Sequence, residues 1–179
     1  MIDAEVRLRA FEVKGLCGSS PFIVRLRDSF MEKARHNLQV CNAIRVLSSE
    51  EDAKTALRLP KDFSAFDWVV VTAYYAMYHS ALAALASVGY KSDNHTATIV
   101  ALEIFFVRKK LLEPEFLDKL KQARELEEEY VRKLRQARRQ RETAQYVVTE
   151  ETGKDAAEKL LGDAQLFVNR IERLIEEKK

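Results

Sequence analysis

The sequence predicts an all-α protein, an up-and-down antiparallel bundle of about five helices. Three observations lead to this fold class. Glycine and proline are rare, with five and three copies in 179 residues, while 32% of the residues are charged. One segment near the middle, Phe66–Val88, is apolar on nearly every side. The other long segments carry apolar residues at steps of three and four, the spacing of a helix with one buried face.

The segment Phe66–Val88 is predicted to form the central helix of the bundle. No formally charged residue lies between Asp67 and Lys91, so a membrane span is the alternative. A membrane span places tyrosine at its ends and rarely carries histidine at mid-depth. This segment has both residue types at its middle, namely Tyr74, Tyr75, Tyr78 and His79. We therefore expect a buried helix of a soluble protein, capped by Ser64 or Asp67 and closed by Gly89, and no membrane partner.

Before the central helix the sequence predicts a short helix and a long one. Residues 1–14 combine strand-like and helix-like spacing, and we favour the helix because no later segment offers a convincing strand partner. Gly15–Pro21 is then a linker. Ser20-Pro21 provides a capping hydroxyl and a proline at the first helical position. The stripe Ile23–Leu47 that follows contains Cys41, which we interpret as a core residue and not as a reactive thiol.

After the central helix the sequence predicts three more helices. One runs from His95 to about Lys110, with a cap among residues 92–94. The next begins at Pro114, since proline suits a first helical turn, and extends to about Tyr146. The last begins at Thr149 or Thr152. Its apolar stripe consists of Leu160, Leu161, Ala164, Phe167, Val168, Ile171, Leu174 and Ile175.

Length and composition predict a protein that folds without a cofactor. A chain of 179 residues can bury roughly 70% of its unfolded surface, so it needs neither a disulfide nor a metal. Two cysteines and three dispersed histidines form no metal motif, and no glycine loop suits a phosphate. The N-terminus lacks the apolar core of a signal peptide, so we expect a cytoplasmic protein. A net charge of +2 excludes a generic polyanion binder.

Three short motifs follow one another at helix-length intervals. The segment Ala73–Leu85 reads AYYAMYHSALAAL. His95 is followed, one helix later, by Phe106-Val107. Residues 141–146 read RETAQY. In this order the motifs resemble the HEPN domains, small helical bundles of prokaryotes, whose third motif is R-x-x-A-D-Y; here Gln145 replaces the aspartate.

The resemblance implies both an organisation and a function. It extends over about residues 28–179, and we divide the chain into an N-terminal arm, residues 1–21, and a HEPN-like bundle, residues 22–179. It implies a homodimeric binding and assembly module that contacts RNA or a nucleotide. It also implies, as a partner for many relatives, a minimal nucleotidyltransferase protein.

The alternative function is a metal-independent ribonuclease, the toxin of a toxin–antitoxin system. Ribonuclease members of the resembled family carry R-x4-6-H, and the resemblance places their arginine at Arg141. Tyr146 stands at the first histidine position, and no histidine follows Arg141 in the chain. Tyrosine has a pKa near 10 and is a poor general base at neutral pH. The candidates for such a degenerate site are Arg141, Tyr146 and His79.

Arg141 is also the most informative residue on its own. It interrupts the apolar line of the helix predicted from Pro114 to about Tyr146, where an arginine should meet a phosphate, a second subunit or a carboxylate. A structural ion pair, or an arginine that snorkels at the edge of the bundle, explains the position equally well. The basic run Arg132–Arg141 fits a phosphate backbone, or a solvated face that nearby glutamates neutralise.

We expect Arg141 to point into a polar cleft as its main anion-binding group, assisted by Arg138. The neighbours that we expect there are Tyr75, Tyr78 and His79. His79 is either a satisfied core histidine or, close to Arg141, a substitute for the missing catalytic histidine. We expect His95 to be a capping or turn residue and His36 to lie on the surface.

Overall fold

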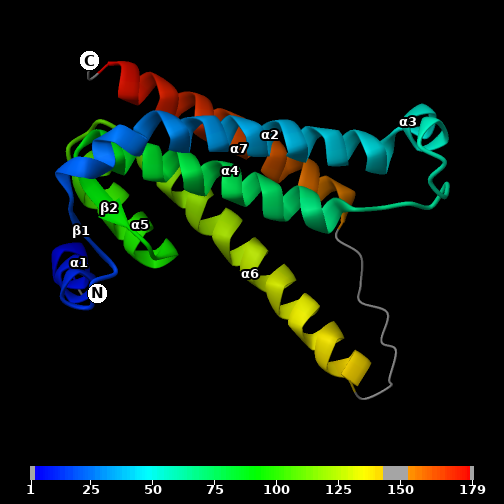
Figure 1. The fold of residues 1–179 in the computed structure, drawn as a ribbon, viewed down its shortest axis with the longest axis horizontal. Helices are drawn as coiled ribbons and strands as arrows, with labels where there is room; N and C mark the ends of the chain where they lie inside the picture. The colour runs from blue at the N-terminus through cyan, green and yellow to red at the C-terminus, as the bar shows by residue number, and fades with distance from the viewer. Residues whose placement is uncertain (1–2, 143–152, 178–179) are drawn as a thin grey trace.

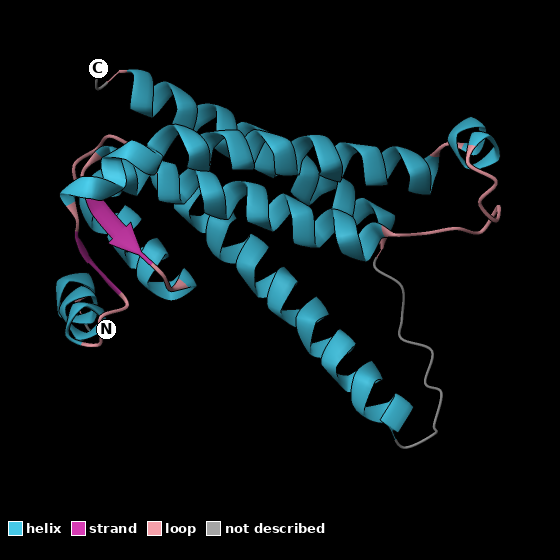
Figure 2. Cartoon of the chain, viewed as in Figure 1, coloured by secondary structure: helices cyan, strands magenta, loops and turns pink. Residues whose placement is uncertain are grey.

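The structure is a computed structural model that describes residues 3–142 and 153–177, and it describes their side chains except at residues 130 and 133–142. The described part of the chain is helical apart from one two-stranded sheet, which confirms the predicted fold class (Figures 1 and 2). The elements in chain order are α1 (Ala4–Val13), β1 (Cys17–Ser19), η1 (Pro21–Leu26), α2 (Arg27–Ser49), α3 (Glu51–Ala56), α4 (Phe66–Ser87), β2 (Tyr90–Ser92), α5 (His95–Leu102), η2 (Glu103–Val107), α6 (Pro114–Glu142) and α7 (Lys154–Glu176).

Helix α4 is the centre of the bundle, as the sequence predicts. Helices α2, α6 and α7 all pack against it, and 15 of its 22 residues are buried. Its alanines, among them Ala73, Ala76 and Ala83, have no exposed surface and allow the neighbouring helices to approach closely. By length and hydropathy α4 could cross a membrane, but 72% of its most apolar window is buried inside the protein. That burial is typical of a core helix.

The last helix confirms the prediction from periodicity. Every residue of its predicted apolar stripe, from Leu160 to Ile175, is buried. Between α6 and α7, Lys119 forms an ion pair with Asp163. Arg170 of α7 donates to the carbonyl of Leu111, over 2.7 Å, and to the carboxylate of Glu113. These contacts fix the start of α6 against α7 and thereby position the part of α6 that faces α4.

The predicted linker Gly15–Pro21 instead contains a strand. β1 pairs with β2 in antiparallel register, with Cys17 opposite Ser92 and Ser19 opposite Tyr90. Both strands have only three residues, too few to show an alternating pattern in the sequence. Gly89, with a φ of +71°, turns the chain between α4 and β2. The prediction of a helix near the N-terminus is confirmed by α1.

Two predicted helix starts are wrong in detail, and one is confirmed. Ser20 forms no side-chain cap, and the segment after it is the 3₁₀ helix η1. Neither Ser64 nor Asp67 caps α4; the cap position is Ala65, whose N–H donates to Ser48 Oγ over 3.0 Å. Asn94 does cap α5, because its Oδ1 accepts the N–H of Ala97 over 3.0 Å. Side-chain caps thus depend on tertiary neighbours that the local sequence does not show.

The predicted helix from His95 to Lys110 is interrupted. Regular α-helix ends at Leu102, the wider turn η2 follows, and Lys110 has a φ of +58°, which ends the segment. Phe106 in η2 has no exposed surface. A one-residue widening of this kind redirects side chains and is not visible in apolar spacing.

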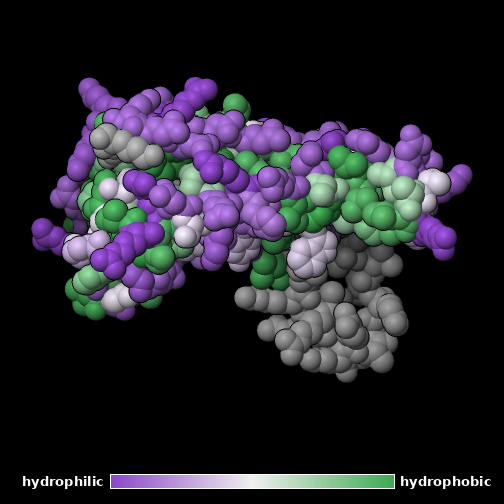
Figure 3. Space-filling view, turned by 45° about the horizontal axis from the view of Figure 1, so that its top comes forward, coloured by the Kyte–Doolittle hydropathy of each residue, from purple (hydrophilic) through white to green (hydrophobic). Residues whose placement is uncertain are grey.

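Helix α6 leaves the bundle along its length. Its first half packs into the core through Leu117, Leu120 and Ala123, while Figure 1 shows its C-terminal end diverging from α4. The predicted end at Tyr146 and the predicted caps Thr149 and Thr152 lie outside the described residues. The surface in Figure 3 is mainly hydrophilic, with scattered hydrophobic patches.

Candidate functional site

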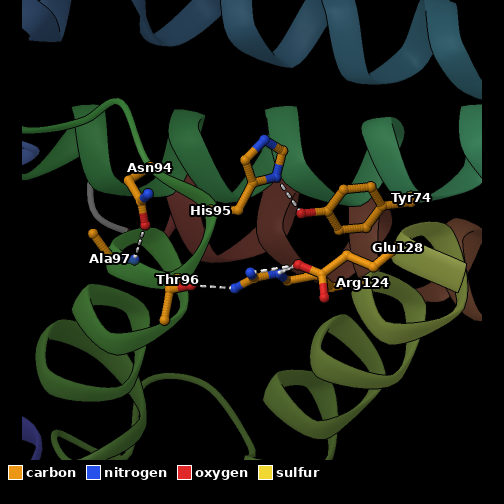
Figure 4. Close-up of polar contacts among 7 residues, drawn as sticks. All are labelled: Tyr74, Asn94, His95, Thr96, Ala97, Arg124 and Glu128. Carbon is orange, nitrogen blue, oxygen red and sulfur yellow. Dashed lines mark hydrogen bonds and ion pairs between the residues drawn. The ribbon is translucent and has the colours of Figure 1, made fainter. Parts of the chain in front are cut away.

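An aromatic cluster forms where α4 meets the start of α5. Tyr74 and Tyr75 are adjacent on α4, Tyr78 lies one turn further along the helix, and His95 is the first residue of α5. The rings of Tyr78 and His95 stack, with centroids 4.1 Å apart and planes 11° apart. The hydroxyl of Tyr74 forms a hydrogen bond with His95 Nδ1 (Figure 4). The imidazole is therefore held on one face and at one nitrogen.

The protonation states of this cluster follow from burial. Burial raises the pKa of Tyr74 and of Tyr78, so both phenols keep their protons. Burial, followed by the positive charge of Arg124, lowers the pKa of His95, so its imidazole is neutral at pH 7. When the Tyr74 hydroxyl donates to Nδ1, the ring proton of His95 lies on Nε2.

Arg124 connects this cluster, which α4 and α5 form, to a third helix, α6. Its Nε donates to Glu128 Oε1 over 2.8 Å, one turn further along α6. Its Nη1 donates to the hydroxyl of Thr96 in the first turn of α5 (Figure 4). Its Nη2 also donates to Glu128 Oε1, over 2.5 Å. The guanidinium is thereby held in one position, and two of its five N–H donors are left over.

These residues line an open cleft of about 550 Å³ between α4, the start of α5 and α6. That volume is in the range of small-ligand sites. The lining residues are Tyr75, Asn94, His95, Arg124, Glu127, Glu128, Val131 and Arg132. We call this the α4–α6 cleft.

The lining of the α4–α6 cleft is rich in hydrogen-bond donors. Arg132 is exposed and has no ion-pair partner among the side chains that the structure describes. Asn94 uses its Oδ1 for the cap of α5, so its Nδ2 hydrogens are available for another acceptor. Tyr75 is half-buried and presents an aromatic ring beside these donors. Two glutamates balance the two arginines, and one of them, Glu128, already pairs with Arg124.

The sequence matches the model of the HEPN domain over residues 44–174, which includes all the helices of the cleft. The chain belongs to the HEPN domain family. It is also 34% identical over 105 residues to a UPF0332 protein of Archaeoglobus fulgidus, across 58% of this chain and 71% of that protein. The resemblance of the three motifs is thus confirmed.

Two of the predicted site residues, Tyr75 and Tyr78, lie at the α4–α6 cleft of this HEPN domain, but only Tyr75 lines it. Tyr75 lines it, whereas Tyr78 is 8% exposed and lies beneath the His95 ring. His79 does not line it: its Nδ1 lies 2.8 Å from the carbonyl of Tyr75 and 3.0 Å from Asn37 Nδ2. Burial lowers the pKa of His79, as expected for a satisfied core histidine. His36 is exposed, as predicted.

Three other predicted site residues of this HEPN domain belong to the last turns of α6 or to the chain after it. Arg138 and Arg141 belong to the last turns of α6, and their side chains are not described; Tyr146 lies outside the described residues. The roles assigned to these three residues stay predictions.

Sequence reasoning missed the two best-placed residues of the cleft. His95 was expected at a cap or turn, yet its ring stacks in the aromatic cluster. In the sequence, Arg124 does not differ from the many other charged residues of α6. The available signal was its helical spacing from Glu128, since residues four apart on a helix are neighbours.

Proposed function

We propose that this HEPN domain is a binding module that holds RNA or a nucleotide in the α4–α6 cleft. Family membership supports a nucleotide- or RNA-related module in general. The observation that carries the specific proposal is the meeting of Tyr75 with Arg124 and Arg132 in one cleft. An aromatic face beside guanidinium groups offers one partner to the base of a nucleotide and another to its phosphate.

The chemistry of the two parts differs. Guanidinium groups bind phosphate oxygens through paired N–H donors. Arg124 is already held by Thr96 and Glu128, so it meets a phosphate without losing much conformational freedom. A nucleobase can stack on the ring of Tyr75, an interaction worth about 1–3 kcal/mol per base. Glu128 is the counter-charge that an incoming phosphate has to displace or share.

The direct test is binding of a fluorescent RNA oligomer, with ATP as the competing mononucleotide. Arg124→Gln should weaken binding about 10-fold or more, because a hydrogen bond to a charged group is worth about 1.5–3 kcal/mol. Arg45→Gln on α2 is the matched control: its side chain is 28% exposed against 24% for Arg124, and it also pairs with a glutamate. Equal loss in the two variants would reduce the binding to general surface charge. Competition by ATP at low concentration would identify a mononucleotide as the ligand.

The same proposal includes two protein contacts, a second copy of the chain and a nucleotidyltransferase protein. The motif resemblance supports both contacts. The projection of α6 beyond the bundle leaves a helix end on which another chain could pack (Figure 1). Light scattering at micromolar concentration should give the mass of a dimer, and a monomer mass would contradict this part. Co-expression with a nucleotidyltransferase protein encoded by a neighbouring gene tests the second contact through co-purification.

A second candidate function, RNA cleavage without a metal, is favoured by the Tyr74–His95 pair. A hydroxyl can donate or accept, so Tyr74 can hold the ring with its proton on either nitrogen. With the proton on Nδ1, Nε2 can take the proton of an RNA 2′-hydroxyl. The 2′-oxygen then bonds to phosphorus, the bond from phosphorus to the 5′-oxygen breaks, and the 5′-oxygen takes a proton from water. The products are a 2′,3′-cyclic phosphate and a free 5′-hydroxyl.

This candidate is tested with purified protein, RNA and EDTA. Cleavage should give cyclic-phosphate ends and should fall about 100-fold or more in His95→Gln, since general acid–base catalysis contributes about 10²–10⁴-fold. His36→Gln, at an exposed position of α2, is the matched control. Absence of cleavage, or equal cleavage by both variants, would leave the domain as a binding module.

A further inference from the structure

We infer that α1, in the N-terminal arm, is a strap that holds α5 in place and thereby positions His95 and Thr96 in the α4–α6 cleft. When α1 is released, α5 loses its fixed position and the cleft loses its shape. The inference rests on the proposed function and adds a positioning element to that site. Helix α1 lies outside residues 44–174, which match the HEPN domain, so its role does not follow from the match.

The first end of α1 is attached to the chain that follows α5. Arg108, directly after η2, donates to Asp3 over 2.7 Å and to Glu5 over 3.4 Å. Its Nε also lies 3.8 Å from Oε1 of Glu103 in η2. One guanidinium thus joins α1 to η2. Both carboxylates of α1 in this attachment are exposed, so salt should weaken it.

The other end of α1 is attached to the chain that precedes α5. The hydroxyl of Tyr90, in β2, donates to Glu12 Oε1 over 2.9 Å. Just after α1, the carbonyl of Leu16 accepts the N–H of Asp93 over 2.9 Å, and β1 then pairs with β2. Asp93 is only two residues before His95. The arm therefore fixes the entry to α5 as well as the segment after it.

Between its two ends α1 packs against α5 and η2 (Figure 1). Ala4 and Leu8 are its buried residues, while Val6 and Val13 are exposed. An isolated helix shorter than about 12–15 residues is marginal in water, and α1 has 10. Its helical state therefore depends on these contacts, and few buried contacts are typical of an element that opens locally.

The start of α5 carries two residues of the candidate site. His95 belongs to the aromatic cluster, and the hydroxyl of Thr96 accepts a hydrogen bond from Arg124. The first turn of α5 is also tied to β2, because Thr98 Oγ1 donates to Ser92 Oγ over 2.9 Å. A shift of α5 would therefore move the imidazole and the anchor of the cleft arginine together.

The main test compares Leu8→Asp with Val6→Asp in the full chain. Leu8 is 7% exposed, so an aspartate there would bury an unpaired charge and release α1. Val6 is 58% exposed on the same helix, so the same substitution should leave α1 attached. In Leu8→Asp, hydrogen exchange followed by NMR should rise at least about 10-fold at Ala97 and Thr98, whose amides are hydrogen-bonded in the first turn of α5. The amides of α7 should stay within about 2-fold of the wild-type rate.

Release of α1 should also change the site itself. Burial, followed by the charge of Arg124, lowers the pKa of His95, so this pKa should rise toward its ordinary value in Leu8→Asp. The pKa of His79 on α4, which burial also lowers, should not change. Affinity for the fluorescent RNA oligomer or for ATP should fall at least about 5-fold, because only the state with α1 attached is competent to bind. Val6→Asp should leave all three quantities as they are in the wild type.

Arg108→Gln is the second variant, which decides the question if Leu8→Asp does not fold. It removes the attachment to Asp3 and Glu5 and should raise exchange at Ala97 and Thr98 about 2- to 10-fold, with a larger effect at low salt. Lys110→Gln is its matched control, because it removes the same charge two residues away. The Lys110 side chain is exposed and has no ion pair within the described part of the chain.

Three outcomes would overturn the inference. Unchanged exchange at Ala97 and Thr98 while the amides of α1 exchange freely would show that α1 does not hold α5. An equal rise in α7 would show a general loss of stability. Unchanged affinity in Leu8→Asp, with a selective loss in Arg124→Gln, would separate α1 from the cleft and leave the proposed function standing. If the wild-type chain binds neither RNA nor ATP, the proposed function fails, and exchange together with the pKa of His95 then decides whether α1 positions this residue.

Discussion

The hydrogen bond between Tyr74 and His95 joins α4 to the start of α5, and its removal has a calculable cost. Tyr74 is 1% exposed, so water cannot replace a lost contact at its hydroxyl. Tyr74→Phe removes one hydrogen bond, worth about 0.5–1.5 kcal/mol net, and leaves Nδ1 of His95 without that partner. A buried acceptor without a partner costs about 1–3 kcal/mol. Because His95 is only half-buried, we expect a loss of about 1.5 kcal/mol in the free energy of unfolding.

The assay is urea unfolding followed by circular dichroism at pH 7. Tyr75→Phe is the control, because this neighbouring tyrosine has no hydroxyl hydrogen bond within the described part of the chain, and it should change the free energy by less than about 0.5 kcal/mol. For a chain of this size, Tyr74→Phe should lower Tm by roughly 3–6 °C. Equal stability of the two variants would refute the claim that this hydrogen bond holds the cleft together.

Three further predictions concern stability and accessibility. Burial lowers the pKa of His79 and of His95 in the folded chain below 6.5. As the pH falls, the unfolded chain therefore binds more protons at these two residues than the folded chain does. The free energy of unfolding should therefore decrease as the pH falls below about 6.5, and the double variant with glutamine at both positions should lose this slope in urea titrations. Burial raises the pKa of the thiols of Cys17 and Cys41, so iodoacetamide at pH 8 should modify them only on unfolding, as read by mass spectrometry. Asn94→Ala should cost about 1 kcal/mol through the lost cap, and Asn94→Gly clearly less, in the same urea assay.

Much of the fold could be predicted because the long helices bury continuous apolar faces. The buried stripe of α7 and the all-round burial of α4 follow directly from spacing. The sheet could not be predicted, since Cys17–Ser19 and Tyr90–Ser92 are three-residue segments that meet across more than 70 residues of sequence. The widened turn η2 was also hidden, because it changes side-chain direction without changing composition.

The candidate site was only partly predictable. Tyr75 could be predicted because it lies in the middle of an apolar helix, where a tyrosine hydroxyl needs a polar partner. His95 and Arg124 come from different helices, and their meeting depends on how α5 and α6 pack beside α4. Local spacing carries no information about such a meeting. The emphasis on Arg141 came from a break in an apolar line, a signal that cannot distinguish a binding residue from a structural one.

The central claim is that the α4–α6 cleft holds a nucleobase of its ligand against Tyr75, and one binding measurement tests it most directly. The affinity for a fluorescent single-stranded RNA is compared between Tyr75→Leu and Trp68→Leu. Trp68 is an aromatic residue of the same helix, 55% exposed, and it does not line the cleft. Loss of one stacking platform is worth about 1–3 kcal/mol, so Tyr75→Leu should weaken binding roughly 5- to 150-fold while Trp68→Leu leaves it within about 2-fold. Unchanged affinity in a folded Tyr75→Leu variant would contradict the account.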